Sequence, residues 1–217
     1  TTLKNSKGVV TIQMDETLWF DKSASSARNN RNVNLSKLRN ILEKIGSIEL
    51  QHEHAYWYVT LGSKVFCDYK SAIDLIDRSR SKNNLPGQEI IQLIEIVSRG
   101  KLCPGLQIEW LDKFKADFAD GVIAALSSLS RQRAEMFTDY HLLLRISECM
   151  LKFDSLNEYA IALKCAALHQ LGKTGIAKRT YDLFYQEYQV VLGEEYPVSF
   201  NELLHSVQYQ IKKHPTI

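Results

Sequence analysis

A chain of 217 residues with 45% hydrophobic content is long enough for one or two globular domains with a sizeable core. Its formal net charge of +2 is too small for bulk electrostatics to indicate a nucleic-acid partner, so such a partner has to be recognised from local charge and pattern. No apolar run approaches the ~18–20 residues that span a bilayer, and no signal peptide is visible, which favours a soluble cytoplasmic protein.

The N-terminal residues predict that the sequence is a piece of a longer protein. The chain starts at Thr1 rather than at an initiator methionine, and its first residues are typical of the tail of a helix that Gly8 ends. A membrane anchor in the missing part is compatible with a cytoplasmic location for this piece.

A short helix, a turn and a long helix are predicted next. The short helix covers Thr11–Phe20, and small polar residues follow it. Either Ser25 or Ser26 is suited to cap the long helix, Ala27–Ile45, and Gly46 ends it. Leucine and isoleucine side chains at 35, 38, 42 and 45 are spaced by three and four, which predicts one buried stripe.

The opposite face of the long helix is rich in amides. It holds Asn29, Asn32, Val33, Ser36 and Asn40, with Asn30 and Lys37 at its margins, while Arg28, Arg31, Lys37 and Arg39 add positive charge near it. Asparagine is a mediocre helix former, so helix stability does not explain this composition. Amides pair bidentately with adenine, and basic side chains reach guanine or phosphate, so this face suits the major groove of DNA. A solvated amphipathic helix with unfavourable propensities is the alternative.

A hairpin follows the long helix. Residues 48–50 and 56–59 are β-rich and flank a polar connector, Gln51–Ala55, of hairpin length. His52 and His54 lie in this connector and are candidates for contacts with a minor groove or a row of phosphates. An exposed turn and a metal-binding pair are the alternatives. A third short extended piece is expected at Val65–Cys67.

The remainder of the chain is predicted to be helical. The expected helices cover 69–80, 87–99, 107–130, 133–153, 157–171 and 173–192, with a last one from about residue 199. They look paired, as in tetratricopeptide arrays, although no clean 34-residue repeat is visible. The change of pattern near Asp68–Tyr69 predicts a domain boundary there.

Several runs resemble one bacterial regulator family. Three runs in the first part resemble the "LWPD … ARN … LSRLR" run of the OmpR/PhoB-type winged helix in the antibiotic regulatory protein (SARP) family: Leu18-Trp19-Phe20-Asp21, Ser26-Ala27-Arg28-Asn29 and Leu35-Ser36-Lys37-Leu38-Arg39. The "GYxL" strand of that family looks like Tyr56-Trp57-Tyr58-Val59. Further along, 102–111 is similar to the "LPG…EW" segment of the bacterial transcriptional activator domain, 171–181 to its "LG…A…Y" helix pair and 191–197 to its "LGxxP" exit.

The resemblance implies a mainly α fold in two domains. Residues 1–68 are expected to form a partial winged helix-turn-helix with a β-hairpin wing, and 69–217 an all-α, tetratricopeptide-like activator domain. Where the family usually carries arginine, this chain has Asn30, Asn32 and Asn34, and Ala55 stands where a wing glycine is common.

The implied function is a sequence-specific DNA-binding transcription regulator and not an enzyme, with no cofactor and no metal. Its expected partners are double-stranded DNA and, through the helical domain, RNA polymerase or a second copy of the chain. An upstream sensor region outside this sequence is expected to control it. The expected DNA-binding residues are Arg28, Asn29, Asn30, Asn32, Asn34, Ser36, Lys37, His52 and His54.

Enzyme motifs are missing from the sequence. It contains no GxGxxG, GxxxxGK[ST], HExxH or GxSxG pattern, and His141, His169 and His205 are isolated on predicted helices. An aromatic stripe at Tyr181, Phe184, Tyr185 and Tyr188 predicts packing between helices, with a peptide groove as the alternative. The second functional hypothesis is a tetratricopeptide-like interaction module without DNA binding of its own.

The four cysteines lie far apart and form no CxxC pair. Cys67, Cys103, Cys149 and Cys165 therefore lack zinc-ligand spacing. The pattern favours buried or half-buried free thiols in a reducing compartment.

Overall fold

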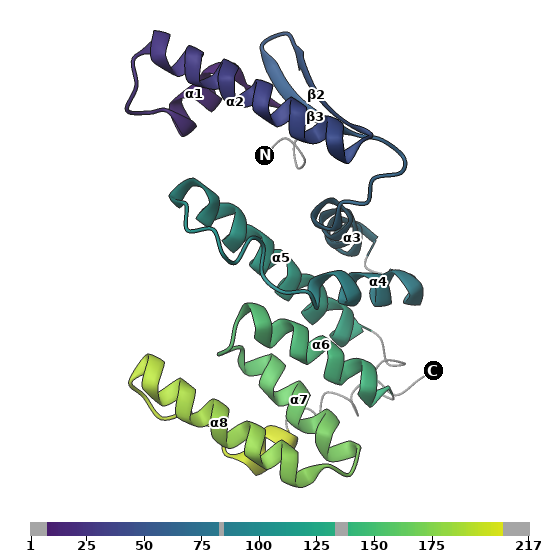
Figure 1. The fold of residues 1–217 in the computed structure, drawn as a ribbon. Coiled ribbons are helices and arrows are strands. Elements are labelled where there is room, and N and C mark those ends of the chain that lie inside the picture. Colours follow the sequence, from purple (N-terminus) through teal and green to yellow (C-terminus); the bar gives the residue numbers. More distant parts are fainter. Residues whose placement is uncertain (1–7, 83–84, 133–138, 206–217) are drawn as a thin grey trace. The chain divides into compact units, whose positions relative to one another are not determined.

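The computed structural model describes residues 8–82, 85–132 and 139–205 of the chain. It is mainly helical, with a small three-stranded antiparallel sheet near the N-terminus (Figure 1). The chain divides into two compact units, Thr1–Ser71 and Ala72–Ile217, and this division falls inside one helix, α3 (Asp68–Lys82).

Unit 1 combines two helices with the sheet. Strand β1 (Val9–Val10) leads into α1 (Thr11–Leu18), and α2 (Ala24–Ile45) is followed by a hairpin of β2 (Ile48–Glu53) and β3 (Tyr56–Leu61). The strand order is β1-β3-β2, and His52 pairs with Trp57 in the β2–β3 register. Helix α2 packs against α1 and against β2 (Figure 1).

Local sequence explains both ends of α2. The Ser23 side chain accepts a hydrogen bond from the Ser26 N–H, so Ser23 caps the helix, and the prediction of a cap at Ser25 or Ser26 was wrong. The helix therefore begins three residues earlier than expected. At the other end, Gly46 has φ +77°, as expected for the residue that ends this helix.

The sheet contains features that the sequence pattern did not predict. The backbone before β1 approaches β3 so closely that a Cβ on Gly8 would lie 2.5 Å from the Trp57 carbonyl oxygen. The expected strand at Val65–Cys67 is wrong, because these residues follow a turn and form no ladder. The helix tail expected before Gly8 lies outside the described residues.

The core of unit 1 is small. Ala27, Leu35 and Trp57 are buried, whereas Leu38 is 37% exposed and Ile45 is 63% exposed. The expectation of one continuously buried stripe is therefore wrong for the C-terminal half of α2. Periodicity identified the apolar face, but little within unit 1 packs over that half.

Unit 2 is a series of helices joined by short loops. After α3 come α4 (Gly87–Val97), α5 (Glu109–Gln132), α6 (Tyr140–Phe153), α7 (Glu158–Gln170) and α8 (Thr174–Leu192), and residues 200–205 are also helical. Consecutive helices from α5 to α8 pack on one another, and α4 packs on α6 (Figure 1). Between residues 87 and 192, the described residues form helices and loops and no strand, as predicted.

Side-chain caps fix where α6 and α7 begin. The Asp139 side chain accepts a hydrogen bond from the Leu142 N–H, and Asn157 accepts one from the Ala160 N–H. Leu143 and Ile146 on α6 and Leu163 on α7 are fully buried. Residues 133–138 of the helix predicted for 133–153 lie outside the described residues, and the described helix starts at Tyr140.

The aromatic stripe of α8 belongs to the core. Tyr181 and Phe184 are buried with Leu168 and Tyr196, and the Tyr181 hydroxyl donates a hydrogen bond to the Val198 carbonyl at 2.7 Å. Burial raises the pKa of Tyr196 to about 12. The prediction that the stripe packs between helices is confirmed for these rings.

Two of the four thiols are buried and two are accessible. Cys149 and Cys165 lie in the interior, where burial raises the pKa of the Cys165 thiol to about 12, whereas Cys67 is half-buried and Cys103 is exposed. In the part of the chain that the structure describes, no helix has both the length and the apolar character needed to cross a membrane.

Candidate nucleic-acid interface

One side of α2 is held against the rest of unit 1. Ala27 and Leu35 are buried on this side, and the Arg39 guanidinium lies over the Trp57 ring, 5.5 Å from its centroid. A cation in this position is attracted by the ring quadrupole. The helix is thus fixed by its apolar side and by Arg39, which leaves the amide side pointing away from the sheet.

The amide side of α2 is open to solvent. Asn29, Asn32, Ser36 and Lys37 are exposed, Asn30 is half-buried, and Val33 among them is 53% exposed. We call Asn29, Asn32, Val33 and Ser36 the amide face, and Asn30 and Lys37 lie at its margins. Its donors and acceptors are available to a ligand, and Val33 adds an apolar group of the kind that contacts a thymine methyl.

Asn34 does not belong to the amide face. It lies about 160° around the helix axis from Ser36, since each residue advances the helix by about 100°. Its side-chain amide donates a hydrogen bond to the Asn30 carbonyl oxygen at 2.8 Å. Asn34 therefore lies beside Asn30 and apart from Asn29, Asn32 and Ser36.

The positive charge on α2 falls into two groups. Arg28 and Lys37 are exposed beside the amide face. Arg31 and Arg39, which were expected to add charge near it, instead turn toward α1 and toward Trp57. The sequence pattern missed this because both partners are distant along the chain.

An ion pair ties α1 to α2. The Arg31 guanidinium donates to the Asp15 carboxylate, and the two side chains are only 11% and 22% exposed, respectively. Asp15 Oδ1 and Arg31 Nε are buried and have no hydrogen-bond partner among the described residues. A charge left alone at this position would be costly, so the pair constrains how α1 meets α2.

The hairpin is braced by a small polar cluster. The His52 ring stacks on Trp57 with centroids 4.3 Å apart, and the Trp57 Nε1–H donates to Thr11 Oγ1 at 3.0 Å. The connector is shorter than predicted, because Gln51, His52 and Glu53 belong to β2. His52 is thus held on the strand, while His54 is exposed in the turn itself.

The turn of the hairpin consists of two residues. His54 has φ +47° and Ala55 has φ +68°, the left-handed values that a type I′ turn requires at both central positions. Such values cost an L-residue other than glycine roughly 1–2 kcal/mol. The tight turn was not predicted because the chain lacks the Asn-Gly or Asp-Gly pair that usually indicates one.

Replacement of Ala55 by glycine is expected to stabilise unit 1. The free energy of unfolding should rise by about 1 kcal/mol, since glycine adopts positive φ without a steric cost. Chemical denaturation monitored by circular dichroism measures the change. The matched control is Ala24→Gly at the start of α2, where no positive φ is relieved and the same substitution should give no gain in stability. A loss of stability in both variants would contradict the turn geometry.

The other histidines among the described residues occupy separate positions. His141 and His205 are exposed, and His169 Nδ1 lies 3.1 Å from Thr174 Oγ1, which joins the end of α7 to the start of α8. Among the described residues, no three His, Cys, Asp or Glu side chains gather as a metal site would require.

Comparison with known proteins found no family model and no curated protein that matches this chain. Function therefore has to be inferred from the residues and their geometry.

Proposed function

We propose that this chain is the DNA-binding and adjoining helical part of a transcription regulator. In this proposal α1 and α2 form a helix-turn-helix, α2 is the recognition helix, and the β2–β3 hairpin is the wing. Unit 2 is a tetratricopeptide-like activator domain that makes protein contacts, with RNA polymerase or with a second copy of the chain. An upstream sensor region controls both activities.

The amide face of α2 carries the proposal. A helix about 10–12 Å across fits the major groove, which is about 12 Å wide. Asn29, Asn32 and Ser36 are exposed on the side away from the sheet, and exposed basic residues flank them. A recognition helix needs this combination of a fixed apolar back and a free polar front.

Each exposed residue has a distinct proposed role. Asn29, Asn32 and Ser36 read base edges, while Arg28 and Lys37 contact phosphates or base edges near them. Asn30 and Asn34 lie at the margin, where Asn34 supports the helix through its bond to Asn30. The hairpin supplies further contacts to the DNA backbone.

In the hairpin, His54 contacts a phosphate from the tip of the wing. His52 acts indirectly, since its stacking on Trp57 supports the hairpin. The type of contact that each residue makes predicts how its replacement changes binding.

The experiment separates phosphate contacts from base contacts. The chain selects its preferred duplex from a randomised pool, and binding is then measured by fluorescence anisotropy over a range of salt concentrations. Arg28→Ala is expected to weaken the binding of all duplexes about equally. It should also reduce the slope of log affinity against log salt concentration by about one. Asn32→Ala is expected to cost roughly 1–3 kcal/mol and to relax preference at one base pair.

Two variants on unit 2 serve as matched controls. Arg179→Ala and Asn201→Ala remove an exposed arginine and an exposed asparagine far along the chain from α2, and both should leave the salt slope and the preferred duplex unchanged. Failure of the pool to yield any preferred duplex would contradict the proposal. The alternative, a tetratricopeptide-like interaction module without DNA binding of its own, would then account for the helical unit.

A further inference from the structure

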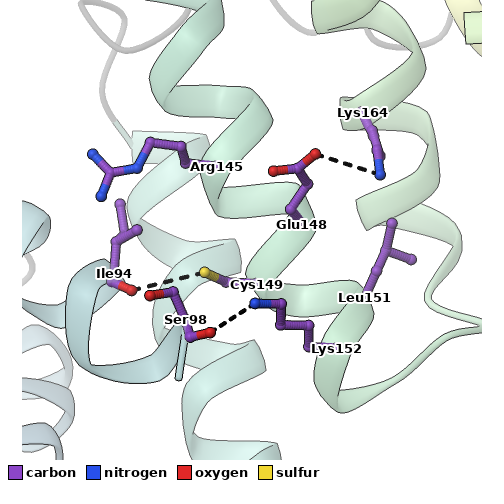
Figure 2. Close-up of a pocket in the computed structure, with 8 residues that line it drawn as sticks. All are labelled: Ile94, Ser98, Arg145, Glu148, Cys149, Leu151, Lys152 and Lys164. Atoms are coloured by element: carbon purple, nitrogen blue, oxygen red, sulfur yellow. Dashed lines mark hydrogen bonds and ion pairs between the residues drawn. The ribbon is translucent and has the colours of Figure 1, made fainter. Parts of the chain in front are cut away.

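One face of α6 carries three charged residues on successive turns. Arg145, Glu148 and Lys152 are separated by three and four positions, which brings them to the same side of a helix. All three are exposed, and Lys164 faces them from α7 (Figure 2). Because the opposite face of α6 is buried, this charged side is fixed in place by the core.

These residues surround a cavity of about 480 Å³ within unit 2. Ile94 and Ser98 contribute from α4 and its C-terminal end, and Cys149 and Leu151 add uncharged surface from α6 (Figure 2). The Cys149 thiol lies 3.9 Å from the Ile94 carbonyl oxygen, and burial raises the pKa of this thiol. The cavity therefore has a neutral, partly apolar wall beneath a charged rim.

The rim carries more positive than negative charge. It has three cations, Arg145, Lys152 and Lys164, and one carboxylate, Glu148. Lys164 lies 3.6 Å from Glu148, and Lys152 donates to the Ser98 carbonyl at 2.6 Å, which uses one of its three N–H groups. The charges of Arg145 and Lys152 are thus not neutralised by Glu148, which is already beside Lys164.

We infer that this cavity binds an acidic peptide segment of a protein partner, with carboxylates of the partner on Arg145 and Lys152 and an apolar side chain of the partner against Leu151. A peptide also has backbone N–H groups that can donate hydrogen bonds to the Glu148 carboxylate. A phosphate backbone has no such donor. An Arg–carboxylate pair is among the stronger charge-assisted contacts. The inference rests on the protein-contact role proposed for unit 2 and does not require DNA binding.

The test is selection of binders from a displayed library of random peptides. We expect the selected peptides to be enriched in Asp and Glu next to Leu, Ile or Phe. The most enriched peptide, made with a fluorescent label, should bind about tenfold or more weakly to Arg145→Gln and to Lys152→Gln. Its counterpart with amides in place of carboxylates should lose affinity to a similar degree.

The matched control is Arg179→Gln, an exposed arginine on α8 outside the cavity, which should bind the peptide as the unchanged protein does. Thermal midpoints establish that every variant is folded. All variants should bind the preferred duplex with equal affinity. A failure of the peptide inference is therefore distinct from a failure of the DNA proposal. A selection without acidic enrichment, or equal peptide affinity of Arg145→Gln and Lys152→Gln, would overturn the inference. Weakened binding of random duplex DNA by these two variants, with peptides unaffected, would assign the cavity to phosphate instead.

Discussion

Phe184→Ala is expected to lower the free energy of unfolding of unit 2 by about 3–5 kcal/mol. The Phe184 ring is 4% exposed, and it meets the Tyr196 ring edge-on with centroids 5.1 Å apart and the Tyr188 ring at 5.9 Å. Truncation would remove the buried ring and leave a cavity that Leu168 and Tyr181 cannot fill without moving. Because this cluster joins α7, α8 and residues 196–204, the loss should affect the whole C-terminal end of the unit.

Urea denaturation of the variant measures this effect. The matched control is Leu183→Ala, the preceding residue on α8, which is 58% exposed and should cost less than about 1 kcal/mol. Equal transition midpoints for Phe184→Ala and the unchanged protein would mean that the ring is accessible. The peptide-groove hypothesis for the aromatic stripe would then replace the packing account.

Asp15→Ala is expected to destabilise unit 1 by about 2–3 kcal/mol, less than the 3–5 kcal/mol typical of fully buried pairs. The reason is that the substitution leaves the Arg31 guanidinium, which is 11% exposed, without its carboxylate. The double variant Asp15→Ala/Arg31→Met should recover much of the loss, since it removes the uncompensated charge while keeping the volume.

The control for this pair is Glu16→Ala, which removes an exposed carboxylate from the next position of α1. Its expected effect is within about 0.5 kcal/mol. Thermal unfolding of the four proteins compares them directly. An Asp15→Ala protein as stable as Glu16→Ala would show that the ion pair contributes little to the junction of α1 and α2.

Helices were predictable from this sequence because their information is local. The three-and-four spacing of apolar residues and the break at Gly46 predicted α2, and Asn157 stands just before α7 as an N-cap should. The amide face was predictable for the same reason, since opposite faces of a helix follow from residue spacing alone.

Features that depend on distant residues were not predictable. Strand β1 has two residues and exists only because it pairs with β3. Arg31 looked like part of the basic edge, but its partner Asp15 lies 16 positions earlier in the chain. The periodicity that placed Leu38 and Ile45 on the apolar face could not say whether another element covers them. The cavity on unit 2 combines side chains of α4, α6 and α7 in the same way.

The measurement that tests the proposed function most directly is the affinity of a triple variant, Asn29→Ala/Asn32→Ala/Lys37→Ala, for the preferred duplex. We expect at least about a hundredfold weaker binding and a loss of sequence preference, because each lost base contact costs roughly 1–3 kcal/mol. The control carries alanine at Arg179, Gln189 and Asn201, which are exposed on unit 2, and should bind normally. If the triple variant binds the preferred duplex with unchanged affinity and unchanged preference, α2 is not the recognition helix and the proposed function is wrong in its central element.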